Sequence, residues 1–167
     1  MMLGLSLSAF TILHVIISLI AIVAGFVVMF GMLGSQTMPG LTGIFLLFTI
    51  LTSVTGFMFP FEMLLPSHML AILSLALLAI ACIALYALKL AGSWRWIYVV
   101  TALASLYLNV FVLVTQIFLK TPALHELAPG NPPNGPAFFA AQGVVLVFFV
   151  VMIVVDWRRF KPMPAEA

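Results

Sequence analysis

The stretch from Ser8 to Leu33, SAFTILHVIISLIAIVAGFVVMFGML, decides the fold of this protein. It contains no Asp, Glu, Lys or Arg and is followed by the turn-rich segment GSQTMPG at 34–40. An α-helix of about 20 apolar residues crosses the roughly 30 Å hydrocarbon core of a bilayer. The stretch therefore predicts a helix that spans a membrane, and the chain turns back after it.

The same pattern recurs along the rest of the chain. Further apolar segments of spanning length lie at about 41–59, 67–90, 94–119 and 138–155. The segment 121–137 between the last two carries five prolines, and proline interrupts helices, so we expect it to be a loop outside the hydrocarbon. The sequence predicts an all-α fold: a polytopic integral membrane helical bundle of five transmembrane helices, with residues 1–167 as a single transmembrane domain.

Composition agrees with this fold class and excludes others. Of the residues, 65% are hydrophobic and only 6% are charged, against about 25% charged in a soluble domain. Six Lys and Arg residues are too few for a nucleic-acid interface, so the expected partner is the lipid bilayer. The start of the chain, MMLGLSLSAF, lacks the basic region of a signal peptide, so we expect the first span to be retained.

The basic residues predict the orientation. The amino end of the first span lies on one side of the membrane, which we call side A. The opposite side is side B. Five spans place most basic residues at side B, with one at side A; they are Lys89, Arg95, Arg158, Arg159 and Lys161 at side B and Lys120 at side A. Cytoplasmic loops are enriched in Lys and Arg, so we expect a cytoplasmic carboxyl terminus and an amino terminus outside.

Histidines and some of the acids gather at the side A end of the predicted bundle. His14 lies inside the first span, Glu62 and His68 flank the start of the third, and His125 and Glu126 lie in the proline-rich loop. An ionisable residue within a span is a functional-site hypothesis by default. Imidazoles suit haem iron, copper and zinc, and carboxylates suit zinc. These five residues are the candidate metal ligands, with haem or copper as the cofactors considered.

Polar residues also recur at helical spacing, and such faces turn away from lipid. The clearest stripe belongs to the fourth span; it comprises Tyr98, Thr101, Ser105, Asn109, Gln116 and Lys120. We expect this span to be the most enclosed. The candidate pocket, open to side A, is lined by His14, Asn109, Gln116, Lys120 and Gln142. The proline-rich loop would cover it as a lid. Small and hydroxyl residues also serve simply to pack membrane helices, which is the alternative for the stripes.

No HExxH, CxxC, GxSxG or phosphate-binding loop occurs, so we do not expect a hydrolase or a phosphotransferase. One hypothesis is a protein with an outward-facing, histidine-lined ligand, metal or redox site. A second is a non-catalytic accessory or assembly protein that docks a membrane-protein partner or a second copy of itself. A third is a proton-coupled small carrier using His14 and Glu62, which is weakened because no titratable group lies at mid-membrane.

Several stretches carry a resemblance that covers most of the chain. They are LTSVTGFMFPF at 51–61, SWRWIYVV at 93–100, LYLNVFVLVTQ at 106–116, PALHELAP at 122–129 and QGVVLVFFV at 142–150. Together they resemble a family of small uncharacterised bacterial inner-membrane proteins. The resemblance implies a bacterial inner-membrane location. It implies no activity and assigns no role to any residue.

Overall fold

The computed structural model describes residues 6–59 and 66–162, and this part of the chain is helical and contains no strand. The elements in chain order are α1 (Leu7–Leu33), α2 (Pro39–Phe57), α3 (Pro66–Cys82) with the π-helix η1 (Ile83–Ala87), α4 (Trp94–Lys120), α5 (Pro122–Leu127) and α6 (Pro136–Arg159). Five helices of the described chain are long and apolar enough to cross a membrane: α1, α2, α3 with η1, α4 and α6. The predicted all-α bundle with five spans is confirmed.

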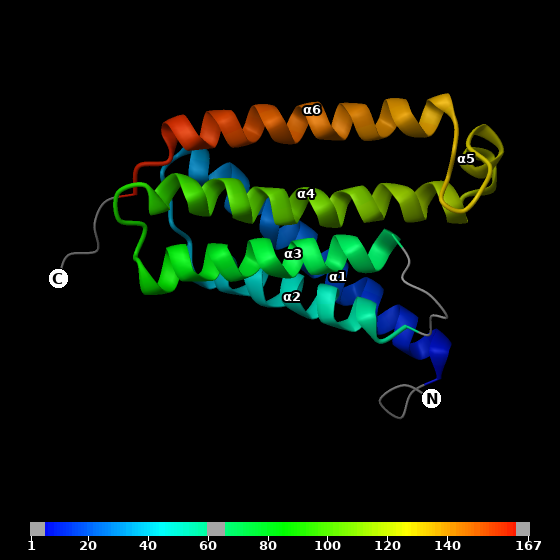
Figure 1. Ribbon diagram of the computed structural model, residues 1–167, viewed down its shortest axis with the longest axis horizontal. Helices are drawn as coiled ribbons and strands as arrows, with labels where there is room; N and C mark the ends of the chain where they lie inside the picture. Colours follow the sequence, from blue (N-terminus) through cyan, green and yellow to red (C-terminus); the bar gives the residue numbers. More distant parts are fainter. Residues whose placement is uncertain (1–5, 60–65, 163–167) are drawn as a thin grey trace.

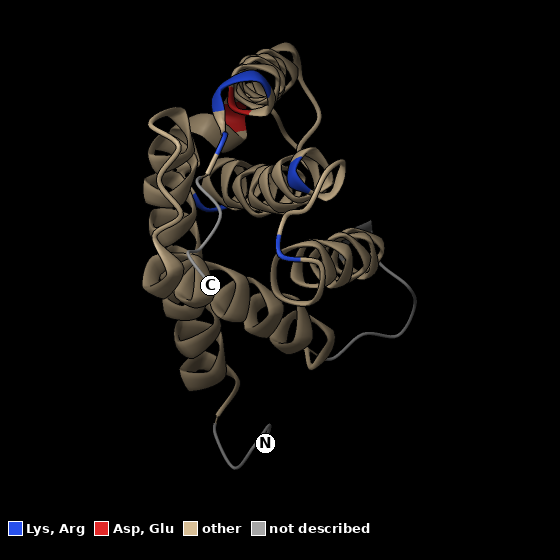
Figure 2. Cartoon of the chain, turned by 90° about the vertical axis from the view of Figure 1, so that its left-hand side faces the viewer, with Lys and Arg blue, Asp and Glu red and all other residues tan. Residues whose placement is uncertain are grey.

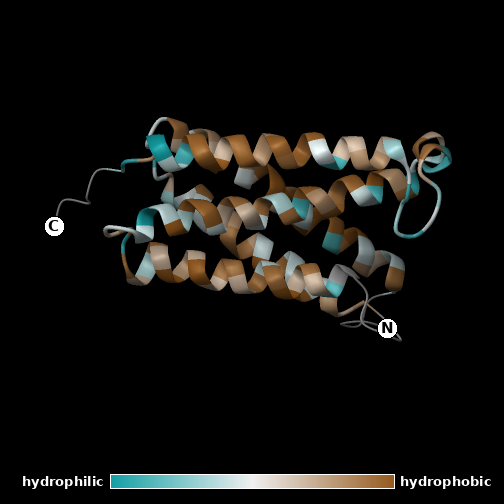
Figure 3. Cartoon of the chain, turned by 45° about the horizontal axis from the view of Figure 1, so that its top comes forward, coloured by the Kyte–Doolittle hydropathy of each residue, from teal (hydrophilic) through white to brown (hydrophobic). Residues whose placement is uncertain are grey.

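The spanning helices lie side by side and alternate in direction (Figure 1). Hydrophobic residues cover most of their length, and hydrophilic residues concentrate at the two ends of the bundle (Figure 3). Figure 2 looks onto side B, where Lys89 follows η1, Arg95 opens α4 and Arg158 and Arg159 close α6. Lys120 closes α4 at side A. This distribution of charge follows directly from the alternation of the helices.

Two expectations differ from the structure: where the third span ends, and the absence of a helix between the fourth and fifth spans. The third span ends at Ala87 rather than at residue 90, because Lys89 and Leu90 adopt positive φ angles of 47° and 58°, which end the helix. The segment 121–137 contains a short helix, α5, which begins at Pro122. Proline is favoured at the first helical position because its missing N–H needs no partner there.

Helix α4 occupies the centre of the bundle. It contacts α1, α2, α3 and α6. In its most apolar window 56% of the residues are buried, against at most 33% in any other span of the described chain. Its polar stripe faces protein from Tyr98 to Asn109, all of it buried. The expectation that this span is the most enclosed is therefore confirmed.

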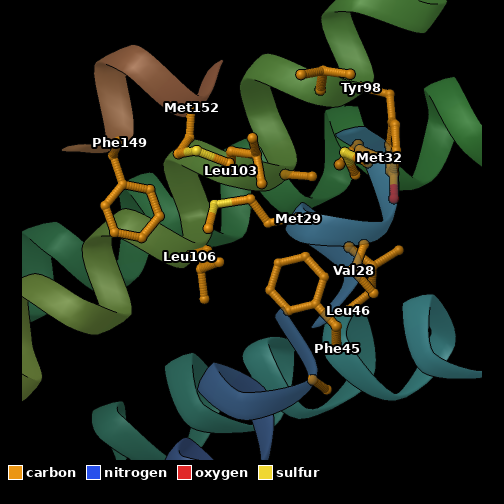
Figure 4. Close-up of a cluster of buried hydrophobic side chains, with 14 of the residues drawn as sticks. Val28, Met29, Met32, Phe45, Leu46, Tyr98, Leu103, Leu106, Phe149 and Met152 are labelled. Carbon is orange, nitrogen blue, oxygen red and sulfur yellow. The ribbon is translucent and has the colours of Figure 1, made fainter. Parts of the chain in front are cut away.

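The larger of the two buried hydrophobic clusters in the described chain lies mainly in the side B half of the bundle, and Figure 4 shows part of it. Its residues come mostly from the side B half of each helix: Ile22–Met32 of α1, Phe45 and Leu46 of α2, Leu78–Ala84 of α3 and η1, Tyr98–Val110 of α4, Phe149 and Met152 of α6, and Phe160 just after α6. Helix α1 crosses the other helices obliquely (Figure 1). Gly25 marks its closest approach to α4 and α2, because a Cβ there would lie 2.6 Å from Leu106 Cδ1 and 2.9 Å from Phe45 Cδ2.

The side B end is also tied together by its loops. Ser35, in the turn between α1 and α2, donates from its hydroxyl to the carbonyl of Arg159 at 2.8 Å and accepts from the backbone N–H of Lys161 at 3.1 Å. The Arg95 guanidinium donates to the carbonyl oxygens of Trp157 and Phe160 at the end of α6. These contacts satisfy carbonyls that a helix end leaves unpaired. They join α1, α4 and α6 where the bundle is closed.

Most hydroxyl groups of the polar stripes are satisfied within their own helix. Thr49 donates to the carbonyl of Phe45 at 2.7 Å, Thr101 to that of Ile97 at 2.7 Å, and Ser105 to that of Thr101 at 2.9 Å. This bonding to the preceding turn removes the cost of an unpaired hydroxyl in hydrocarbon. The hydroxyl stripes therefore allow close helix packing without relying on hydrogen bonds between helices.

Candidate functional site

The side A half of the bundle encloses a cavity of about 540 Å³. Four helices and the residues that follow two of them contribute its walls. The lining residues that carry polar side chains are Thr11, His14, Ser18, Thr52, Ser53, His68, Ser74, Asn109, Gln116, Lys120 and Thr121. Valine, leucine, isoleucine and phenylalanine side chains make up most of the remaining wall. The cavity is therefore amphipathic, and it lies where the hydrophobic core ends.

The oblique course of α1 explains why the cavity is there. Helices α1 and α4 meet closely at Gly25 and Leu106. From that crossing they diverge toward side A, and the cavity walls are formed by α1 up to Ile22 and by α4 from Leu108 onward. Figure 1 shows α1 separating from α4 toward its amino end. The packing of a single glycine at mid-bundle thus sets where the two helices begin to separate.

His14 is held in one orientation by α2. Its Nδ1 lies 2.7 Å from Thr55 Oγ1, and its ring packs edge-on against Phe59 with centroids 5.2 Å apart. The Thr55 hydroxyl donates its own hydrogen to the carbonyl of Leu51 at 2.7 Å. With that hydrogen used toward α2, Thr55 Oγ1 is free to accept, and we assign the imidazole hydrogen to Nδ1, which donates to it. In the neutral imidazole this leaves the lone pair on Nε2.

Lys120 gives the mouth of the cavity its charge. It lies in the last turn of α4, is exposed, and is near enough to His14 for its positive charge to act on the imidazole. No Asp or Glu of the described chain lines the cavity. Among the described residues, the charged group at this mouth is therefore the Lys120 cation, which favours a neutral or anionic ligand group over a second cation.

His68 joins His14 in the cavity wall from the first turn of α3. It is 3% exposed, and its ring lies 5.7 Å from that of Phe57 between centroids. The two histidines reach the same cavity because α1 and α3 run in the same direction and each carries its histidine near its side A end. The structure thus brings together two of the three histidines of the sequence.

The deep end of the cavity holds polar atoms without partners. Asn109 and Ser74 are 9% and 3% exposed, and both line the cavity. Asn109 Nδ2 and Ser74 Oγ have no hydrogen-bond partner within the described part of the chain. A buried polar group without a partner costs several kcal/mol in hydrocarbon. A cavity occupant that accepts hydrogen bonds there would remove this cost.

The cavity opens sideways as well as toward side A. Val15 and Leu19 of α1 and Ile117 of α4 line it and are 39%, 43% and 43% exposed. In a bilayer, such exposed apolar side chains on spanning helices meet lipid. The opening between α1 and α4 therefore faces hydrocarbon, and only its side A end, near Lys120, reaches the interface.

Gln142 does not line this cavity, contrary to expectation. Its amide nitrogen donates to the carbonyl of Phe111 at 3.0 Å and to Thr115 Oγ1 at 3.3 Å, both on α4. No residue of α6 lines the cavity. Helix α6 reaches α1 through Phe148 and Phe149, which pack against Phe26, whereas Gln142 meets α4. The role that its contacts support is to join α6 to α4.

The proline-rich loop is not a lid over the cavity, which is a second correction. His125 and Glu126 belong to α5, which packs against α4 and α6, and neither lines the cavity. Apolar contacts hold the loop there, because Phe118, Ala128 and Phe138 form a small buried cluster joined by Leu124. Thr121 alone of 121–137 reaches the cavity wall. Glu62 lies outside the described residues.

The number of candidate metal ligands that the structure brings together is small. Within the described part of the chain, no three His, Cys, Asp or Glu residues are grouped closely enough to hold a metal ion. Structural zinc sites use four such ligands and catalytic zinc sites three. Of the predicted ligands, His14 and His68 share the cavity, and His125 and Glu126 do not.

Two residues that matter at this site, Thr55 and Ser74, were not predicted from the sequence. Thr55 follows Thr52 by three residues, so the helical spacing of polar residues in the second span would have pointed to it. Ser74 stands alone among apolar residues of the third span, so no polar stripe pointed to it.

Compared with protein-family models, with curated proteins and with solved structures, the chain has no match.

Proposed function

We propose that this integral membrane protein is a binding protein for a small amphipathic molecule, which occupies the cavity with His14 as its polar anchor. Ligand pockets typically measure about 300–1,000 Å³ and combine apolar walls with a few placed polar groups, and the cavity of about 540 Å³ fits that description. The observation that carries the proposal is the oriented imidazole: Thr55 fixes the His14 ring, with its second nitrogen left to meet a ligand.

Electrostatics favour an organic ligand over a metal ion. Lys120 places a positive charge at the mouth, and the described lining residues include no carboxylate to offset a bound cation. Two like charges about 4 Å apart repel by roughly 4 kcal/mol at the effective dielectric constant of a protein surface. An uncharged or anionic group avoids this repulsion and can accept hydrogen bonds from Lys120 and Gln116.

The test is to purify the protein in mild detergent and measure what it retains. We expect an organic molecule in a fixed molar ratio to protein, and we expect His14→Leu to lose most of it, while the matched variant His125→Leu keeps it. A haem Soret band, or copper or zinc in a fixed ratio, would overturn the proposal in favour of a metal or redox centre. Retention of nothing that depends on His14 would favour an accessory or assembly protein.

We further propose that the protein resides in a bacterial inner membrane with its carboxyl terminus in the cytoplasm. The excess of Lys and Arg at side B supports this orientation, since such residues stay on the cytoplasmic side. The resemblance to small bacterial inner-membrane proteins supports the location. On this orientation the cavity lies in the outer half of the membrane.

Reporter fusions test the orientation. Alkaline phosphatase fused after Lys161 should be inactive, and a fluorescent protein at the same point should fluoresce, because side B is cytoplasmic. Alkaline phosphatase inserted at the exposed Asn134, between α5 and α6, should be active. The opposite pattern at both points would reverse the orientation, and the cavity would then open toward the cytoplasm.

A further inference from the structure

We propose that the ligand is a membrane-soluble quinone or quinol, whose ring lies in the cavity with one oxygen at Asn109 and the other near His14 and Gln116. This inference rests on the proposed function and names the chemical class of the ligand. It concerns binding, and it involves no electron-transfer step.

The opening of the cavity restricts the ligand to molecules that dissolve in the bilayer. Val15, Leu19 and Ile117 form exposed apolar edges between α1 and α4. A molecule passing between them leaves any long tail in the surrounding lipid while its head group enters the cavity. A water-soluble ligand would need no apolar side opening of this kind.

The deep end of the cavity requires a ligand that is polar at its inner end. Asn109 Nδ2 and Ser74 Oγ are buried donors without partners in the described chain, near the middle of α4 and α3. A fatty acid or phospholipid entering head-up would place its acyl chain against them and leave them unpaired. A carbonyl oxygen at this depth accepts from the Asn109 amide and removes the free-energy cost of leaving that donor unpaired.

The outer end of the cavity can both accept and donate. His14 Nε2 carries a lone pair, because Nδ1–H donates to Thr55. It therefore accepts from a ligand hydroxyl. Gln116 lines the same end of the cavity and offers an amide that donates to a ligand carbonyl. Both the hydroxyl of a quinol and the carbonyl of a quinone find a partner there.

The spacing of the two amides on α4 matches a ring with oxygens on opposite sides. Asn109 and Gln116 lie two helical turns apart on one face, so their Cα atoms are roughly 10 Å apart along the axis. The oxygens of a 1,4-quinone are roughly 5 Å apart, and two hydrogen bonds of about 2.8 Å extend this to about 11 Å. A sterol, with a single hydroxyl, would satisfy only one of the two ends.

The test begins with a solvent extract of the purified protein, assayed for quinones and for phospholipids and fatty acids. We expect quinone enriched over its proportion in the source membrane. Binding of a benzoquinone with a decyl tail is then measured by equilibrium dialysis in detergent. Loss of one hydrogen bond should weaken binding to Asn109→Leu about fivefold. Thr115→Val removes a polar group from α4 outside the cavity and should bind as the parent does.

The possible failures are distinguishable. If a phospholipid or fatty acid is retained in a His14-dependent way and the decyl benzoquinone does not bind saturably, the quinone assignment is wrong and the proposed function stands. If nothing is retained, the proposed function itself fails. If Asn109→Leu binds the probe as tightly as the parent, the placement of the ring at Asn109 is wrong. Circular dichroism shows whether each variant is folded, and Ser74→Ala provides a second test at the same end of the cavity.

Discussion

Replacing Gly25 by valine should destabilise the protein by about 1–3 kcal/mol, which is the usual cost of overpacking a core and corresponds to a Tm lower by several degrees. A Cβ at this position would lie 2.6 Å from Leu106 Cδ1 and 2.9 Å from the Phe45 ring. Leu106 and Phe45 are both fully buried among the core residues (Figure 4), so neither side chain can move aside without displacing its neighbours. Thermal unfolding in detergent, followed by circular dichroism, measures the effect.

Gly143→Val is the matched control for this prediction. Gly143 is also inside a spanning helix, α6, and a Cβ there would meet nothing within 4 Å. Both variants carry the same change in helix propensity, so their difference isolates the contact of α1 with α2 and α4. Equal Tm values for the two variants would show that this crossing is not tightly packed in the membrane protein, and the account of why α1 and α4 diverge would fail.

The number and type of the helices were predictable because each span is a long apolar stretch, and lipid leaves an apolar chain few alternatives to a helix. The boundaries were less predictable. The third span was expected to continue to residue 90, since Leu88 and Leu90 are as apolar as the span itself, but the backbone turns at Lys89. The short helix α5 was missed because proline at its first position looked like a loop signal.

The candidate site was predictable in part, for a physical reason. Periodicity identifies the face of a helix that is turned to protein, and His14, Asn109, Gln116 and Lys120 do share one cavity. Periodicity does not identify which neighbour covers that face. Gln142 faces protein as its spacing predicts, but its neighbour is the far side of α4, so it lies outside the cavity.

Thr55→Val should weaken ligand binding about fivefold, through His14 rather than through the ligand, since a typical hydrogen bond contributes about 1 kcal/mol. Without the hydroxyl, the Nδ1–H of His14 loses its acceptor on α2 and the ring is no longer fixed with Nε2 toward the ligand. Loss of the outer partners of a ligating histidine typically costs about 10–100-fold at metal sites, so a smaller effect is expected for a neutral ligand. The readout is the molar ratio of the co-purified molecule to protein.

A double-mutant cycle separates positioning from structural damage. In the His14→Leu background, which should itself lower retention about tenfold, Thr55→Val should change retention less than about twofold, because the group it positions is gone. Thr49→Val serves as the control, since Thr49 is buried on the same helix, bonds only to the carbonyl of Phe45 and does not line the cavity. If Thr55→Val lowers retention equally with and without His14, Thr55 acts on the fold of α2 instead. The oriented imidazole would then not be what holds the ligand, and the anchor would have to be sought at His68 or Lys120.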